Sequence, residues 1–196
     1  MPLNTAHAFR TAAILFGTAV LSSALNTPAV VATTNEVQAI DAATGAVRSA
    51  SSRQAYEQLL DRERRCLAVP SASTADGVGT VLESCGTSAD HHQHWQMRDL
   101  GNGYYRIIAR HSGKCLTVPS SSTANNVRVT QRTCGTGTNQ QWRFSPLFSG
   151  YYEIMPRHTG KCLTPRYDPA EERPVAVQNL CADVSYQQWV RRIAPS

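Results

Sequence analysis

The chain has 196 residues, of which 41% are hydrophobic and 17% charged, and its formal net charge is +5 at pH 7. This length and composition are typical of about one globular domain with its own core. The basic residues are isolated or interrupted by acids, as in residues 62–65 (Arg-Glu-Arg-Arg), so the sequence favours a solvated surface over a nucleic-acid interface.

Residues 1–32 are predicted to be a signal peptide. The apolar stretch 12–21 follows Arg10, is too short to cross a bilayer and is followed by small residues. Residues 30–32 (Val-Val-Ala) suit a cleavage site, and residues 22–24 (Ser-Ser-Ala) offer a second one. No later apolar run reaches membrane length, so we expect a secreted, extracellular protein without membrane insertion.

Residues 33–53 are predicted to form a flexible N-terminal segment. They are rich in Ala, Ser and Thr, and their few larger apolar side chains are Val37, Ile40 and Val47. Such a segment cannot form a core alone. Two interpretations stay open: it docks on a partner protein as an extended strand through these three residues, or it is a spacer.

The rest of the chain, residues 54–196, is a threefold internal repeat. A Gln-x-Trp signature recurs with its tryptophans 47 residues apart, as Gln93 with Trp95, Gln140 with Trp142, and Gln187 with Trp189. Cysteines separated by 19 residues precede each signature: Cys66 and Cys85, Cys115 and Cys134, Cys162 and Cys181. The two periods agree, and they place the repeats at about 54–100, 101–147 and 148–193.

The six cysteines are predicted to form three disulfides, one inside each repeat. An oxidising compartment favours disulfides, and the equal spacings select one of the fifteen possible connectivities. Each bond is worth on the order of 3 kcal/mol in the chain-entropy model. A zinc site is the competing interpretation, but no Cys-x-x-Cys spacing is present.

Each repeat is predicted to contain four short strands separated by Gly, Ser, Asn and Pro turns, for the second repeat at 104–109, 114–118, 127–131 and 142–145. Residues 54–61 have a helix-forming composition. However, Tyr56 stands ten residues before the first cysteine of its repeat, as Tyr105 and Tyr152 do in theirs. We therefore expect a strand there too, and an all-β chain.

Three units of this length, each with an internal cysteine pair and a terminal Gln-x-Trp, resemble the ricin-type β-trefoil family over residues 56–193. The resemblance implies a β-trefoil with pseudo-threefold symmetry. It also implies that the three tryptophans pack around the core and that the three glutamines hydrogen-bond the backbone. Both residue types are thus expected to be structural.

The resemblance further implies where sugars would bind. Family members use an Asp directly after Cys-Leu, an aromatic residue two positions before the second cysteine and an Asn before Gln-x-Trp, because sugars need hydroxyl acceptors and a flat apolar face. Here the Asp positions hold Ala68, Thr117 and Thr164, and the aromatic positions hold Glu83, Arg132 and Asn179. We expect the usual sites to be lost. A residual site of Thr117, Asn139 and Gln140 is the alternative.

Two stretches outside this pattern contain candidate functional residues. Residues 166–174 replace the small polar loops of the other repeats, and Arg166, Tyr167 and Asp168 there are predicted to dock a protein partner; a solvated loop stiffened by prolines is the alternative.

His91, His92 and His94 suit a metal or a pH switch by residue type, but only Asp90 stands nearby. We expect no metal and no cofactor.

No nucleophile motif, matched carboxylate pair or phosphate-binding loop occurs in the chain, so we expect no enzyme. The leading hypothesis is an adaptor in an exported assembly, because the resemblance implies a toxin or lectin subunit as partner, docked through the N-terminal segment. The alternative is a lectin with a variant carbohydrate site. A protease inhibitor acting through the Tyr167 loop is a minor alternative.

Overall fold

The computed structural model describes residues 30–33, 36–40, 47–49, 55–182 and 184–196, which belong to two compact units, Met1–Ser52 and Arg53–Ser196. Residues 1–29 of the predicted signal peptide lie outside the described residues, as do residues 34–35, 41–46 and 50–53 of the N-terminal segment. Among the described residues, no helix is long and apolar enough to cross a bilayer.

The first unit holds three short antiparallel strands, β1 (Val30–Thr33), β2 (Glu36–Ile40) and β3 (Val47–Ser49), in the order β1-β2-β3. Val37 is paired with Ala32, and Ile40 with Val47. The three apolar residues predicted to dock a partner thus all lie on paired strands, and the predicted cleavage after Ala32 falls within β1.

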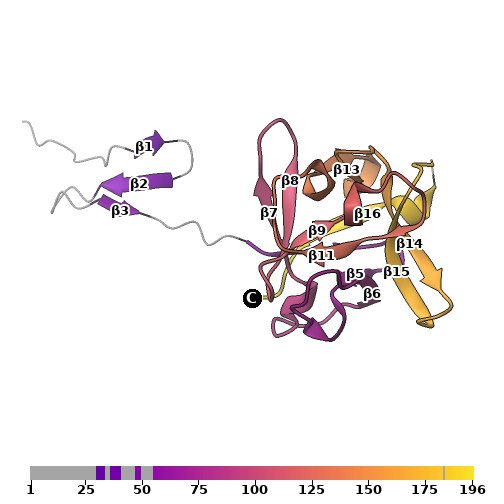
Figure 1. The fold of residues 1–196 in the computed structure, drawn as a ribbon. Helices are drawn as coiled ribbons and strands as arrows, with labels where there is room; N and C mark the ends of the chain where they lie inside the picture. The colour runs from indigo at the N-terminus through magenta and orange to yellow at the C-terminus, as the bar shows by residue number, and fades with distance from the viewer. Residues whose placement is uncertain (1–29, 34–35, 41–46, 50–54, 183) are drawn as a thin grey trace, which may run out of the picture. The chain divides into compact units, whose positions relative to one another are not determined.

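The second unit is a β-trefoil of three similar repeats (Figure 1). The first repeat holds β4 (Glu57–Leu60), β5 (Arg65–Ala68), η1 (Pro70–Ala72), β6 (Val81–Ser84), η2 (His91–Gln93) and β7 (Trp95–Asp99). The second holds β8 (Tyr105–Ala109), β9 (Cys115–Thr117), η3 (Pro119–Ser121), β10 (Val127–Arg128), β11 (Thr130–Arg132), η4 (Thr138–Gln140) and β12 (Trp142–Pro146). The third holds η5 (Phe148–Gly150), β13 (Tyr151–Pro156), β14 (Cys162–Asp168), β15 (Arg173–Asn179), η6 (Ser185–Gln187) and β16 (Trp189–Ile193).

The first and last strands of the repeats close a barrel of six strands. Following the hydrogen-bonded neighbours, β4 pairs β16, β16 pairs β13, β13 pairs β12, β12 pairs β8, β8 pairs β7, and β7 returns to β4. Outside the barrel, each repeat has one hairpin, β5 with β6, β9 with β11, and β14 with β15, and the short strand β10 pairs with β15. Closure leaves the barrel without free strand edges.

The strands fall close to where the repeat predicts them. Residues 54–61 contain β4 despite their helical composition, because the barrel buries Gln58, Leu59 and Leu60 in succession. The predicted strand 127–131 is divided at Val129: β10 pairs with β15 of the third repeat, whereas β11 pairs with β9 of its own repeat. This division joins neighbouring repeats.

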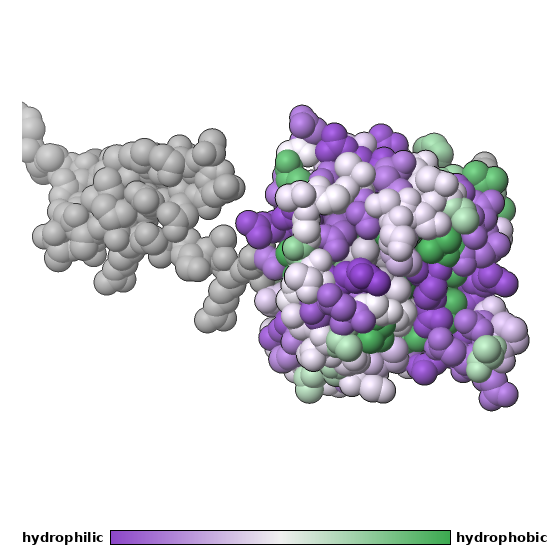
Figure 2. All heavy atoms as spheres, viewed as in Figure 1, coloured by the Kyte–Doolittle hydropathy of each residue, from purple (hydrophilic) through white to green (hydrophobic). Residues whose placement is uncertain are grey.

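The core is built from the same residues in each repeat. The three tryptophans are fully buried, and each indole N–H donates at 2.9 Å to the carbonyl of the leucine after the first cysteine: Trp95 to Leu67, Trp142 to Leu116, and Trp189 to Leu163. On the face of this unit seen in Figure 2, hydrophobic residues form small separate groups among hydrophilic ones. The apolar residues of the repeats therefore pack mainly in the core.

The disulfides and glutamines hold the turns around this core. Cysteines pair within each repeat as predicted, with Cα atoms 5.0, 5.0 and 4.9 Å apart. Each glutamine accepts from one backbone N–H and donates to one backbone carbonyl: Gln93 from Gly86 and to Ser84, Gln140 from Gly135 and to Thr133, Gln187 from Ala182 and to Leu180. These side chains are structural.

Candidate functional site

The residues predicted as a residual sugar site lie together in the second repeat, with their polar groups turned to internal partners. Thr117 is 1% exposed; its hydroxyl donates to the Cys115 carbonyl at 2.8 Å and accepts from the Gln140 amide at 3.0 Å. Asn139 donates to the Val118 carbonyl at 2.8 Å. The threonine hydroxyl is thus shielded from any ligand in solution.

In the first repeat, the glutamine of the Gln-x-Trp signature has a different side-chain partner. Ala68 has no hydroxyl, and the Gln93 amide donates instead to the Glu83 carboxylate at 2.8 Å. His92 lies at 2.8 Å from the same carboxylate, and His94 is fully buried with Nδ1 at 3.2 Å from Arg110. Two of the three clustered histidines are therefore held by neighbours in the fold.

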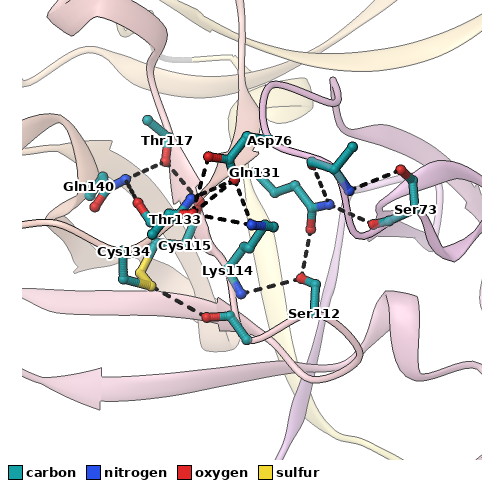
Figure 3. A network of polar contacts seen from close by, with 12 residues as sticks. Ser73, Asp76, Ser112, Lys114, Cys115, Thr117, Gln131, Thr133, Cys134 and Gln140 are labelled. Atoms are coloured by element: carbon teal, nitrogen blue, oxygen red, sulfur yellow. Dashed lines mark hydrogen bonds and ion pairs between the residues drawn. A yellow bond between two sulfur atoms is a disulfide. The ribbon is translucent and has the colours of Figure 1, made fainter.

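The repeats meet at three seams, where a loop or hairpin of one repeat contacts the next repeat. At the seam between repeats one and two, His111 lies 2.9 Å from the Ser73 carbonyl. Gln131 donates to the same carbonyl at 2.6 Å, and Lys114 pairs with Asp76 at 2.7 Å (Figure 3). The hydrogen bond from Lys114 holds the pKa of Asp76 below its usual range. This seam is closed by side chains.

The seam between repeats two and three repeats the arrangement. His158 lies 3.0 Å from the Ser122 carbonyl, and Gln178 donates to the same oxygen at 2.7 Å. Lys161 donates to Asn125 at 2.6 Å, in the place of the Lys114 ion pair. A histidine, a glutamine and a lysine thus close both seams.

The seam between repeats three and one has different residues at all three positions. Arg62, Leu82 and Arg65 stand where the other seams have His, Gln and Lys. The guanidinium of Arg62 lies over the ring of Tyr151, 4.5 Å from its centroid. Arg65 is held by Asp61, whose carboxylate accepts from Nε at 2.8 Å and from Nη2 at 2.6 Å. These side chains do not reproduce the histidine, glutamine and lysine contacts of the other two seams.

The turn between β4 and β5 at this seam carries backbone strain. Arg64 has φ of 62°, and the matching positions in the other repeats are Gly113 and Gly160, with φ of 67° and 65°. A side chain in this left-handed region costs roughly 1–2 kcal/mol, which glycine avoids. Strained residues of this kind cluster at binding sites, and here the strained residue, Arg64, places a guanidinium at the seam.

The third repeat contributes a hairpin to this seam in place of a tucked loop. Strands β14 and β15 pair from Cys162 with Asn179 out to Asp168 with Arg173, and the hairpin extends away from the barrel (Figure 1). Arg128 holds it from the side, at 2.8 Å from Glu171 and 3.5 Å from Asp168.

The three residues predicted to dock a partner divide into two kinds on this hairpin. Arg166 is exposed and Tyr167 is 60% exposed, so both are presented to solvent. Asp168 is used within the fold, through the Arg128 ion pair. The hydrogen bond from Arg128 also holds the pKa of Glu171 below its usual range.

A surface pocket of about 170 Å³ lies at the seam between repeats three and one, which is called the open seam below. It is lined by Asp61, Arg62, Glu63 and Arg65 of repeat one and by Pro165, Arg166, Tyr167, Pro174 and Tyr186 of repeat three. Tyr186 is 53% exposed and occupies the position of Asn139 before the Gln-x-Trp. Two exposed tyrosines, two prolines and several charged groups therefore converge.

The sequence predicts Arg166 and Tyr167 of this pocket as functional residues. It does not single out Tyr186, and it favours a solvated surface for the stretch 62–65. The available signal was the departure of Arg62 and Arg64 from the histidine and glycine of the other two repeats. What the repeat pattern alone does not show is that these residues lie opposite the hairpin.

Comparisons with known proteins agree with this architecture. A model of the ricin-type beta-trefoil lectin domain-like family matches residues 56–132, 91–178 and 138–194. The chain belongs to this family. No curated protein matches the chain.

Solved structures of similar fold include a designed 3-fold symmetric protein, ThreeFoil, with 38% identity over 70% of this chain and 97% of that one, at a TM-score of 0.63. An exo-beta-1,3-galactanase from Clostridium thermocellum is 26% identical over 81% of this chain, at a TM-score of 0.67, and only 34% of the galactanase is covered. The cytolethal distending toxin from Actinobacillus actinomycetemcomitans shares the fold at 19% identity, with a TM-score of 0.58 over 74% of this chain and 94% of that one.

Proposed function

We propose that this chain is a secreted, non-catalytic carbohydrate-binding module that holds its ligand at the open seam between repeats three and one. The observation that carries the proposal is the pocket itself, which replaces the side-chain closure of the other two seams. Membership of a lectin-like family supports the ligand class, and three disulfides suit an extracellular life.

The chemistry of the pocket fits a sugar ring. Tyrosine faces cover the apolar C–H face of a pyranose, while guanidinium and carboxylate groups bind its hydroxyls. Tyr167 and Tyr186 offer the faces, and Arg62 and Glu63 are exposed in the same pocket. Asp61 is 3% exposed and is used to orient Arg65, so it is a supporting residue.

The test is a glycan array probed with the full chain and with two single variants. Tyr186→Ala is expected to lose at least about fivefold in affinity, because stacking on one aromatic face is worth roughly 1–3 kcal/mol. Tyr104→Ala is the matched control, since its ring lies at another seam beneath Arg157, 4.6 Å from the ring centroid. Equal binding by both variants would place the ligand elsewhere.

A second candidate is the adaptor role in an exported assembly, with an exported toxin or lectin subunit as partner. Its support is the projecting hairpin, where the exposed Arg166 and Tyr167 are residue types that anchor protein interfaces. Docking through Val37, Ile40 and Val47 in the N-terminal segment belongs to the same proposal. Deleting residues 33–53 from the full chain would then abolish capture of a stoichiometric partner from culture fluid, while leaving sugar binding intact.

A further inference from the structure

Two further hollows share the lining residue Arg62 with the pocket at the open seam. The second hollow, of about 250 Å³, is lined by Leu60, Asp61, Arg62, Arg64, Tyr151, Val190, Arg191 and Arg192. The third, of about 280 Å³, is lined by Arg62, Leu147, Phe148, Ser149, Tyr151 and Gln188. The three hollows together are called the arginine groove below.

The arginine groove concentrates the positive charge of the protein. Six arginines line its first two hollows, against the two carboxylates of Asp61 and Glu63. Arg65 is paired with both of these carboxylates, and Arg191 with Glu57 at 2.6 Å. The other four guanidiniums are those of Arg62, Arg64, Arg166 and Arg192. This surplus accounts for most of the formal net charge of +5.

The four remaining guanidiniums are placed to meet a ligand. All four residues are exposed. Arg192 donates to the neutral Gln58 amide oxygen at 2.6 Å, and Arg62 lies over the Tyr151 ring, so both are positioned without being neutralised. Guanidinium groups bind carboxylates through two parallel hydrogen bonds, which are stronger than bonds to neutral acceptors.

Aromatic rings accompany these charges along the groove. Tyr167 and Tyr186 line the first hollow, Tyr151 lines the second and third, and Phe148, which is 95% exposed, lines the third. The groove therefore offers flat apolar faces and fixed positive charge in three hollows that share Arg62.

We propose that the arginine groove binds an acidic polysaccharide, with uronic-acid rings covering the aromatic faces and their carboxylates bound by Arg62 and Arg166. This inference rests on the proposed function and names its ligand class. An acidic peptide would also pair with the arginines. Sugar rings have, in addition, apolar C–H faces that can stack on the exposed aromatic rings. The separate hollows suit successive residues of one chain.

The experiment is calorimetric titration of the full chain with oligogalacturonate, oligoglucuronate and oligomannuronate, and with the methyl esters of the same oligomers. The esters keep the rings and remove the charge. At least one acid oligomer is expected to bind, with its ester at least about tenfold weaker, because hydrogen bonds to charged groups are worth about 1.5–3 kcal/mol. Binding of the acid form should also weaken as salt is raised.

Single variants locate the charge. Arg62→Gln and Arg166→Gln are each expected to weaken acid-oligomer binding about tenfold. Arg143→Gln, an exposed arginine at a different seam, is expected to leave it unchanged. Circular dichroism of each variant checks that the fold is intact.

Three results would overturn the inference. Equal affinity for acid and ester, with Tyr186→Ala still harmful, would leave the sugar site in place and remove its acidic specificity. Equal binding of oligoglutamate would make the ligand an acidic peptide. Failure of every acidic oligomer would end the inference, and failure of every saccharide, neutral ones on the array included, would end the proposed function as well.

Discussion

The two closed seams and the open seam are built on the same scaffold, but they have different residues at equivalent positions. At the closed seams, a histidine and a glutamine meet one backbone carbonyl, as His111 and Gln131 do at Ser73. At the open seam, Arg62 and Leu82 occupy those positions and a pocket is present. A repeated fold thus allows one junction to change while the other two maintain stability.

The largest expected effect lies in what all repeats share. Trp142→Ala should lower the free energy of unfolding by about 3–5 kcal/mol, because it removes a fully buried indole and its hydrogen bond to Leu116. Urea unfolding followed by circular dichroism measures this loss. Trp95→Ala and Trp189→Ala should cost similar amounts; a loss below about 1 kcal/mol for any of the three would show that the repeats do not share one core.

The next effect separates closed from open seams. Gln131→Leu copies Leu82 into the seam between repeats one and two, and should destabilise by about 1–3 kcal/mol. The Ala75 carbonyl loses its donor, and the Ser73 carbonyl keeps only the contact with His111. Arg62→Ala at the open seam should change stability by less than about 0.5 kcal/mol. Thermal unfolding of both variants checks the contrast, and similar losses would mean that the open seam is also a structural junction.

Lowering the pH should reduce the free energy of unfolding through a buried histidine in repeat one. Burial, followed by the nearby Arg110, holds the pKa of His94 below its usual value of 6.5. The folded state therefore binds its proton at lower pH than the unfolded state, so stability is full above about pH 6.5 and falls as the pH drops below it. The loss is at most about 1.4 kcal/mol per pH unit for this histidine.

The matched variant is His94→Gln, since the second and third repeats have Gln141 and Gln188 at this position. Free energies of unfolding measured between pH 8 and pH 5 should depend less on pH in this variant. Some dependence should stay, because burial also lowers the pKa of His111. An unchanged pH profile would show that His94 titrates alike in both states.

The smallest effect concerns backbone strain at the open seam. Arg64→Gly restores the residue found at Gly113 and Gly160, and should stabilise by about 0.5–1 kcal/mol, the difference between the relieved strain and the entropy of glycine. Chemical denaturation measures the gain, and acid-oligomer titration should show weaker binding. A less stable variant would mean that the Arg64 side chain contributes contacts that outweigh its strain.

The sequence predicts the parts of this molecule that repeat. The period of Gln-x-Trp and cysteine pairs locates the disulfides, the strands and the buried tryptophans, because each repeat must satisfy the same local hydrogen bonds. It predicts β4 correctly even where composition favours a helix, since the barrel contacts of Leu59 override local propensity.

The parts that were not predicted depend on register between repeats. Strand β10 leaves its own repeat to pair with β15, and Arg62 meets the hairpin that carries Arg166, more than a hundred residues later. No period in the sequence shows such neighbours. The substitutions at Arg62, Arg64 and Leu82 are visible only when each repeat is compared with the other two, which makes departure from the repeat the useful signal.

The central claim is that ligand binds at the open seam and not at the positions of the usual sugar sites. Backbone amide shifts of the isotopically labelled full chain, recorded during titration with an acidic oligosaccharide, test it most directly. We predict that the shifts concentrate at residues 61–65, 166–168 and 186. Shifts concentrated at residues 117–118 and 139–140 would contradict it, and would return the site to the second repeat.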